Sequence, residues 1–175
     1  MESYFTVTLP TKAYLKKYLE AQYGHPLIFS INSYFGQVLA LVLAKNVYPD
    51  RNTAVVHKAF DKYDNFIDIK MPAKWLKHYR YGTDIDPKKA VYINKLVENK
   101  FEDELVNYCT LLDMFDIKRK DSLLDFCTRY NFEIDVDITF DSIKKMEYRY
   151  RQKNKEKYKR ILSPDIEKAI QARFF

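Results

Sequence analysis

Two stretches of the chain share one pattern of apolar and polar positions. In residues 5–9 and again in residues 67–71, an apolar side chain occupies every second position. A period of two is typical of a β-strand with one face buried. Pro10 and Pro72 follow these stretches. Each proline is expected to end its strand, because it has no backbone N–H and its φ suits the first turn of a helix.

Helical patterns follow both prolines. After Pro10, apolar residues recur at helical spacing until Gly24, and residues 33–45 form a second, more apolar pattern that Ser33 can cap. After Pro72, residues 73–81 predict a short helix closed by Gly82, and residues 88–112 predict a long amphipathic one. Each copy, about 4–48 and about 64–112, therefore reads strand, helix, helix.

This repetition predicts a duplicated domain over residues 1–112. Each half is too small to build a core alone, so we expect the two halves to bury their apolar faces together. Their strands should then pair antiparallel around Val7 and Ile69. Between the copies, residues 54–59 are a candidate for one further strand.

The remaining residues, 113–175, form a helical C-terminal region. Apolar positions in residues 121–132 have helical spacing, and after the polar break at residues 133–137 a second helix follows that Thr139 can cap. This outline is that of a helix-turn-helix, whose second helix enters the major groove, although any helical hairpin supplies it. The expected fold class is α+β, predominantly helical: a duplicated strand-helix-helix unit followed by a C-terminal helical hairpin.

The net charge of +6 is concentrated in this last helix. Residues 144–160 hold nine Lys and Arg against two Glu, a local charge of +7, and residues 161–175 are neutral. Such concentration is typical of a surface that meets a polyanion. Phe140, Ile143, Met146 and Tyr150 predict its apolar side. The predicted contact residues, at helical spacing on the other side and beside it, are Lys144, Lys145, Tyr148, Arg149, Arg151, Lys155 and Lys159.

The order of a strand, a proline and two helices resembles the ribbon-helix-helix family of DNA-binding proteins. In that family two identical strands pair and insert their outward side chains into the major groove. The resemblance implies a single-chain pseudo-dimer that reads bases with Thr6 and Thr8 in one strand and with Lys70, beside Asp68, in the other. The alternative is a duplicated scaffold whose paired strands only close a core.

Other classes of function have little support in the sequence. Cys109 and Cys127 predict two buried free thiols rather than a disulfide or a zinc site. Glu133, Asp135 and Asp137 alternate as metal ligands could, but capping of the next helix is the nearer explanation. The sequence contains no phosphate-binding loop motif, no nucleophile-elbow motif GxSxG and no zinc-protease motif HExxH. We therefore expect no catalysis, no metal and no cofactor.

We expect a protein of the cytoplasm that binds nucleic acid, with duplex DNA favoured, in a regulatory or accessory role in replication or in a mobile element. No apolar run approaches the length of a membrane span. The alternative is a phage-type or host-interaction structural protein whose basic helix binds an acidic protein. A third interpretation of the basic helix is a solvated face with no partner.

Overall fold

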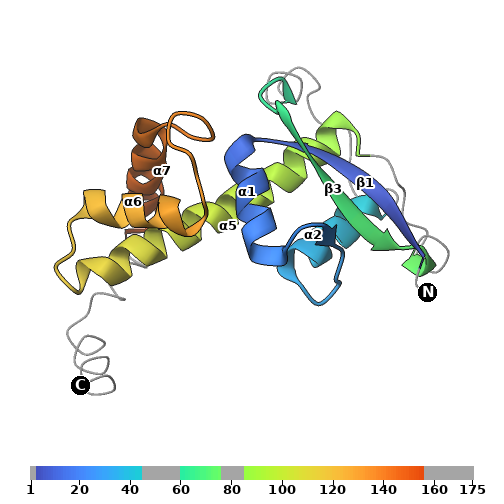
Figure 1. The fold of residues 1–175 in the computed structure, drawn as a ribbon, viewed down its shortest axis with the longest axis horizontal. Coiled ribbons are helices and arrows are strands. Elements are labelled where there is room, and N and C mark those ends of the chain that lie inside the picture. Colours follow the sequence, from blue (N-terminus) through green and yellow to red (C-terminus); the bar gives the residue numbers. More distant parts are fainter. Residues whose placement is uncertain (1–2, 45–59, 76–84, 156–175) are drawn as a thin grey trace. The chain divides into compact units, whose positions relative to one another are not determined.

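The computed structural model describes residues 3–44, 60–75 and 85–155, and it has the expected α+β, mostly helical fold (Figure 1). The chain divides into two compact units, residues 1–99 and residues 100–175. The long helix α5 (Pro87–Asp113) contributes residues to both. The division thus falls inside this helix, whereas the sequence placed the end of the first domain near residue 112.

The first unit contains a three-stranded sheet. Strand β1 (Tyr4–Thr11) pairs antiparallel with β3 (Asn65–Pro72), and Val7 lies opposite Ile69. This pairing confirms the prediction, and the apolar residues of both strands face one core: Val7, Leu9, Ile67, Ile69 and Met71 are each at most 2% exposed. A third strand, β2 (Leu27–Ile28), pairs parallel with β3 and gives the order β1-β3-β2. The sequence did not predict it, because two residues are too few to show a period.

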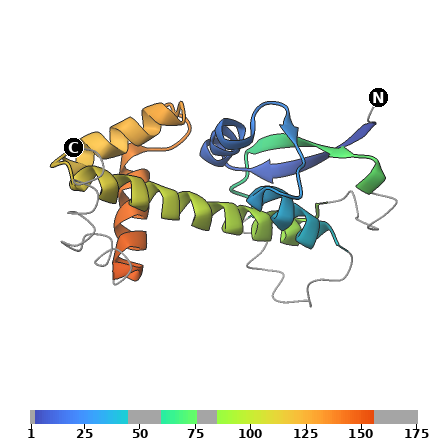
Figure 2. The same ribbon diagram turned by 90° about the horizontal axis from the view of Figure 1, so that it is seen from below.

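The helices of the first copy lie where they were expected. Helix α1 (Ala13–Tyr23) ends at Gly24, whose φ of 84° favours glycine. Helix α2 (Tyr34–Leu43) begins after Ser33, which accepts a hydrogen bond from the Gly36 amide at 2.9 Å, so the predicted cap is confirmed. Figure 2 shows α2 and the first turns of α5 on one side of the sheet.

The second copy is described only in part. Its strand is β3 and its long helix is α5, close to the predicted bounds of 88–112. The predicted short helix at 73–81 falls largely outside the described residues, as does the strand considered at 54–59. The full correspondence of the two copies therefore stays a prediction.

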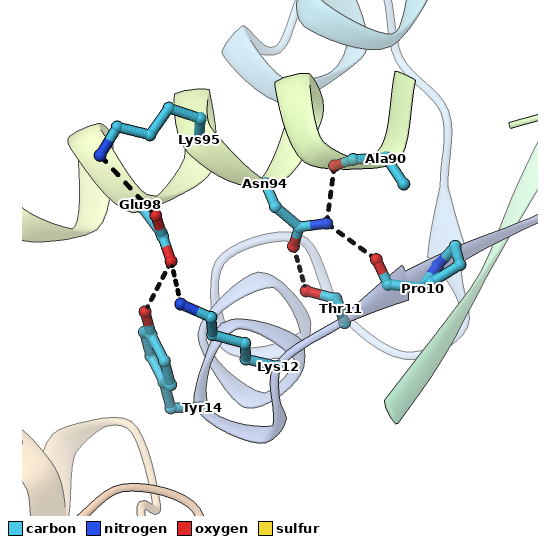
Figure 3. A network of polar contacts seen from close by, with 8 residues as sticks. All are labelled: Pro10, Thr11, Lys12, Tyr14, Ala90, Asn94, Lys95 and Glu98. Atoms are coloured by element: carbon cyan, nitrogen blue, oxygen red, sulfur yellow. Dashed lines mark hydrogen bonds and ion pairs between the residues drawn. The ribbon is translucent and has the colours of Figure 1, made fainter. Parts of the chain in front are cut away.

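A buried polar network joins β1 to α5 (Figure 3). The Asn94 amide donates to the carbonyl oxygens of Pro10 and Ala90, both at 2.8 Å, and its oxygen accepts from the Thr11 hydroxyl at 2.5 Å. Beside it, Glu98 accepts from Lys12 at 2.5 Å and from the Tyr14 hydroxyl at 3.2 Å. Lys12, the residue that precedes α1, thus binds α5.

The second unit packs the last part of α5 with α6 (Arg119–Arg129) and α7 (Phe140–Lys153). Aromatic rings fill its core, with the centroids of Phe101 and Phe126 5.6 Å apart. Cys109 and Cys127 are free and buried, as predicted. The Thr139 hydroxyl accepts from the Ser142 amide at 3.2 Å, which confirms the predicted cap of α7.

Candidate nucleic-acid interface

Helix α7 presents a basic surface to solvent. We call this surface the basic face, and its exposed residues are Lys144, Lys145, Tyr148, Arg149 and Lys153 of α7, together with Lys155 two residues beyond the end of the helix. From Lys144 to Lys153 it extends about 14 Å at the helical rise of 1.5 Å per residue. The Tyr148 ring lies among these cations with 56% of its surface exposed. Asp141, in the first turn, is exposed beside them.

The opposite side of α7 packs against the unit, and most of it is the predicted apolar side. Ile143 is fully buried, and Phe140, Met146 and Tyr150 are partly buried. The Tyr150 hydroxyl lies 3.4 Å from Asp103 Oδ1 of α5, and burial, followed by the charge of Asp103, raises the pKa of this phenol. These contacts fix which side of α7 faces water.

Glu147 is buried on the inner side of α7, and the sequence analysis did not predict a buried charge there. Only 2% of it is exposed, and Oε1 lies 3.2 Å from Arg119 Nη1 and 3.1 Å from Arg151 Nε. Arg119 also pairs with Asp113 at the end of α5. One sequence signal was available: Glu147 follows Ile143 by four residues and precedes Arg151 by four, so it lies between an apolar position and a cation.

Arg151 therefore differs from the other predicted contact residues. Its side chain is 36% exposed, and its Nε is turned toward Glu147. Among the predicted contact residues in the described part of this basic segment, Arg151 is thus the one that is only partly exposed. Lys159, the last predicted contact, lies outside the described residues.

The sheet brings the other predicted contact residues together on its outward face. Thr6 lies opposite Lys70 and Thr8 opposite Asp68, and all four are exposed. The Thr8 hydroxyl donates to Asp68 Oδ1 at 2.7 Å. The two charges cancel, so these four residues supply no net attraction for a polyanion. Moreover, the strands belong to a three-stranded sheet, in which Ile28 of β2 lies beside Lys70, and not to the two-stranded ribbon that the resemblance implied.

The alternating carboxylates before α7 have a local structural role. Asp137 Oδ2 accepts a hydrogen bond from the Glu133 amide at 2.7 Å, which closes the turn that precedes the helix. The described residues include no group of three or more His, Cys, Asp or Glu that could hold a metal ion. In the same part of the chain, none of the helices is long and apolar enough to cross a membrane.

Comparison with family models, with curated proteins and with solved structures found no match. The geometry of this chain alone therefore supports the proposals below.

Proposed function

We propose that this protein binds nucleic acid, with duplex DNA favoured, through the basic face of α7, and that it binds without catalysing a reaction. The observation that carries the proposal is the exposure of five cations on this one face: Lys144, Lys145, Arg149, Lys153 and Lys155. Phosphate contacts by such side chains supply most of the sequence-independent affinity for DNA, because each contact releases condensed counterions. A regulatory or accessory role in replication or in a mobile element belongs to the same proposal.

The packing of α7 supports this use of the helix. Ile143 and the Tyr150–Asp103 contact hold the inner side against the unit. The exposed cations therefore lie on the half of the helix that faces solvent, and Lys144 and Lys153 mark its two borders, half a turn apart. A helix surface about 14 Å long spans several phosphates, because duplex DNA carries one negative charge per about 1.7 Å of its axis.

We place the sheet second in this proposal. Thr6, Thr8 and Lys70 point outward as base-reading residues would, but Asp68 opposes phosphate and already binds Thr8. The sheet would therefore supply sequence preference only after the cations of α7 have brought the nucleic acid to the protein. The ribbon-helix-helix relationship remains a prediction within this proposal.

An acidic protein partner is the second candidate, and Tyr148 favours it. Tyrosine and arginine are residue types enriched at the centre of protein interfaces, and Tyr148 is an exposed tyrosine with lysine and arginine beside it. An interface with an apolar centre would depend on salt much less steeply than phosphate binding does.

The test compares two variants that lose equal charge. In the first, Lys144, Lys145 and Lys155 are changed to Gln; in the matched control, the exposed lysines Lys100, Lys118 and Lys120 of the same unit are changed to Gln. Binding to a fluorescent duplex is measured by anisotropy at several salt concentrations. If α7 contacts phosphate, the first variant loses affinity for every sequence, and its salt slope shrinks by roughly 2.7 units, about 0.9 for each lost contact.

The control variant has the same net charge, so it should retain most of the affinity. Equal losses in both variants would show that only the overall charge matters and would contradict a site on α7. Unchanged affinity in the first variant, with normal circular dichroism, would also contradict it. Binding of an acidic polypeptide but not of DNA would favour the second candidate.

A further inference from the structure

Glu147 is a buried carboxylate that the binding proposal does not use. It lies in the middle of α7 on the side away from the basic face, and only 2% of it is exposed. A buried charge is costly unless it is paired, so the helix would be expected to carry an apolar residue here if packing were its only task. The contacts of Glu147 point to a different role.

The charges around Glu147 form a chain whose two ends, Asp113 and Arg151, are partly exposed and in which Glu147 itself is buried. Asp113 pairs with Arg119, Arg119 Nη1 lies 3.2 Å from Glu147 Oε1, and the same oxygen lies 3.1 Å from Arg151 Nε. Positive and negative groups alternate along it and the sum is zero. Arg119 belongs to α6 and Asp113 to α5, so two other helices supply this end of the chain.

Arg151 is the outer end of this chain, at the border of the basic face. Its Nε is buried and lies 3.1 Å from Glu147 Oε1 in an ion pair that lacks hydrogen-bond geometry, whereas its side chain as a whole is 36% exposed. A guanidinium is planar and carries its donors in a rigid fork, so fixing the Nε edge also fixes the direction of the terminal nitrogens. A free lysine or arginine would have to lose its rotamer freedom on binding a phosphate, which lowers affinity.

We propose that Glu147 is a positioning residue that orients Arg151 as a preorganised phosphate contact at the border of the basic face. This inference rests on the proposed function. Glu147 touches no ligand itself, and Arg119 with Asp113 holds its carboxylate in place. Lys144 and Arg149, by comparison, are exposed on the same helix.

The test is a double-mutant cycle between Glu147→Gln and Arg151→Gln, read by the affinity for duplex DNA and by its salt slope. Each single variant should lose about 3- to 10-fold in affinity and about 0.9 units of slope, the value of one phosphate contact. The double variant should bind no more weakly than Arg151→Gln alone. Once Arg151 is replaced, Glu147 has no guanidinium to orient, so its own replacement should cost no further affinity.

The matched control is a second double-mutant cycle, between Glu147→Gln and Arg149→Gln. Arg149 is an exposed arginine of the same helix. The losses from Glu147→Gln and Arg149→Gln should multiply, since nothing couples the two residues. A general loosening of α7 would instead make Glu147→Gln weaken binding equally in the presence and in the absence of Arg151, and that result would overturn the inference. Tighter binding by Glu147→Gln would overturn it as well, because it would show that Glu147 withholds Arg151 from the ligand.

A second variant keeps the inference testable if Glu147→Gln does not fold. Arg151→Lys retains the charge at a half-exposed site but removes the fork, so it should bind almost as weakly as Arg151→Gln. Affinity equal to that of the wild-type protein would refute orientation by Glu147. If the wild-type protein itself does not bind duplex DNA, the proposed function fails; if it binds and the cycle is multiplicative, only the role of Glu147 fails.

Discussion

Asn94 should be the polar residue on which the first unit depends most. Its amide accepts from Thr11 and donates to the Pro10 carbonyl, and Asn94 and Thr11 are both fully buried. Leucine has a similar volume and no hydrogen-bonding group, so Asn94→Leu leaves the Thr11 hydroxyl and the Pro10 carbonyl without this partner. Each buried group left unsatisfied costs about 1–3 kcal/mol, and we expect a total loss of about 2–6 kcal/mol in the free energy of unfolding.

The assay is urea denaturation followed by the fluorescence of Trp75. This residue is the only tryptophan of the chain, and it packs edge-on against Phe29 with ring centroids 5.5 Å apart, so its emission reports the first unit. Asn99→Leu is the control, because Asn99 is exposed on the same helix and its replacement should change stability by less than about 0.5 kcal/mol.

A second substitution separates hydrogen bonding from packing. Adding Thr11→Val to Asn94→Leu removes the hydroxyl that was left unsatisfied, so part of the lost stability should return. A cost below about 1 kcal/mol for Asn94→Leu would refute the reasoning. So would a double variant whose loss equals the sum of the two single losses, because the residues would then act independently.

Two further predictions concern close packing and pH. A Cβ atom on Gly36 would lie 1.7 Å from the Ser30 carbonyl oxygen, so Gly36→Ala should destabilise by about 1–3 kcal/mol or more in thermal unfolding; a stabilised variant would contradict this close approach. Burial raises the pKa of Cys109 to about 12. Above pH 9 the unfolded chain releases this proton while the folded protein keeps it, so stability should fall as pH rises, by up to about 1.4 kcal/mol per pH unit. Cys109→Ala should reduce that slope, and an unchanged slope would show that other groups cause it.

The elements whose hydrophobic pattern repeats several times could be predicted from the sequence. The alternation in β1 and β3 determined which side chains face the core, and the pairing of Val7 with Ile69 followed from it. The pattern of α5 gave both of its ends to within one residue. Strand β2 could not be predicted, because its two residues have no period and are held by pairing with β3.

The buried polar contacts could not be predicted from the sequence, for a different reason. Asn94 and Thr11 are 83 positions apart, and neither residue type indicates its partner. Glu147 was counted only as a charge in a basic segment, and its burial depends on Arg119, which belongs to another helix. As a result four of the five exposed cations of the candidate site were predicted, whereas Lys153 and the inward orientation of Arg151 were not.

The salt dependence of duplex DNA binding by the wild-type protein tests the central claim most directly. The basic face exposes five cations, Lys144, Lys145, Arg149, Lys153 and Lys155, and Arg151 lies at its border. If most of them meet phosphates, log K should fall linearly with log salt concentration with a slope of roughly −4 to −5, at about 0.9 per contact. No binding at low salt, or a slope near zero, would contradict the account.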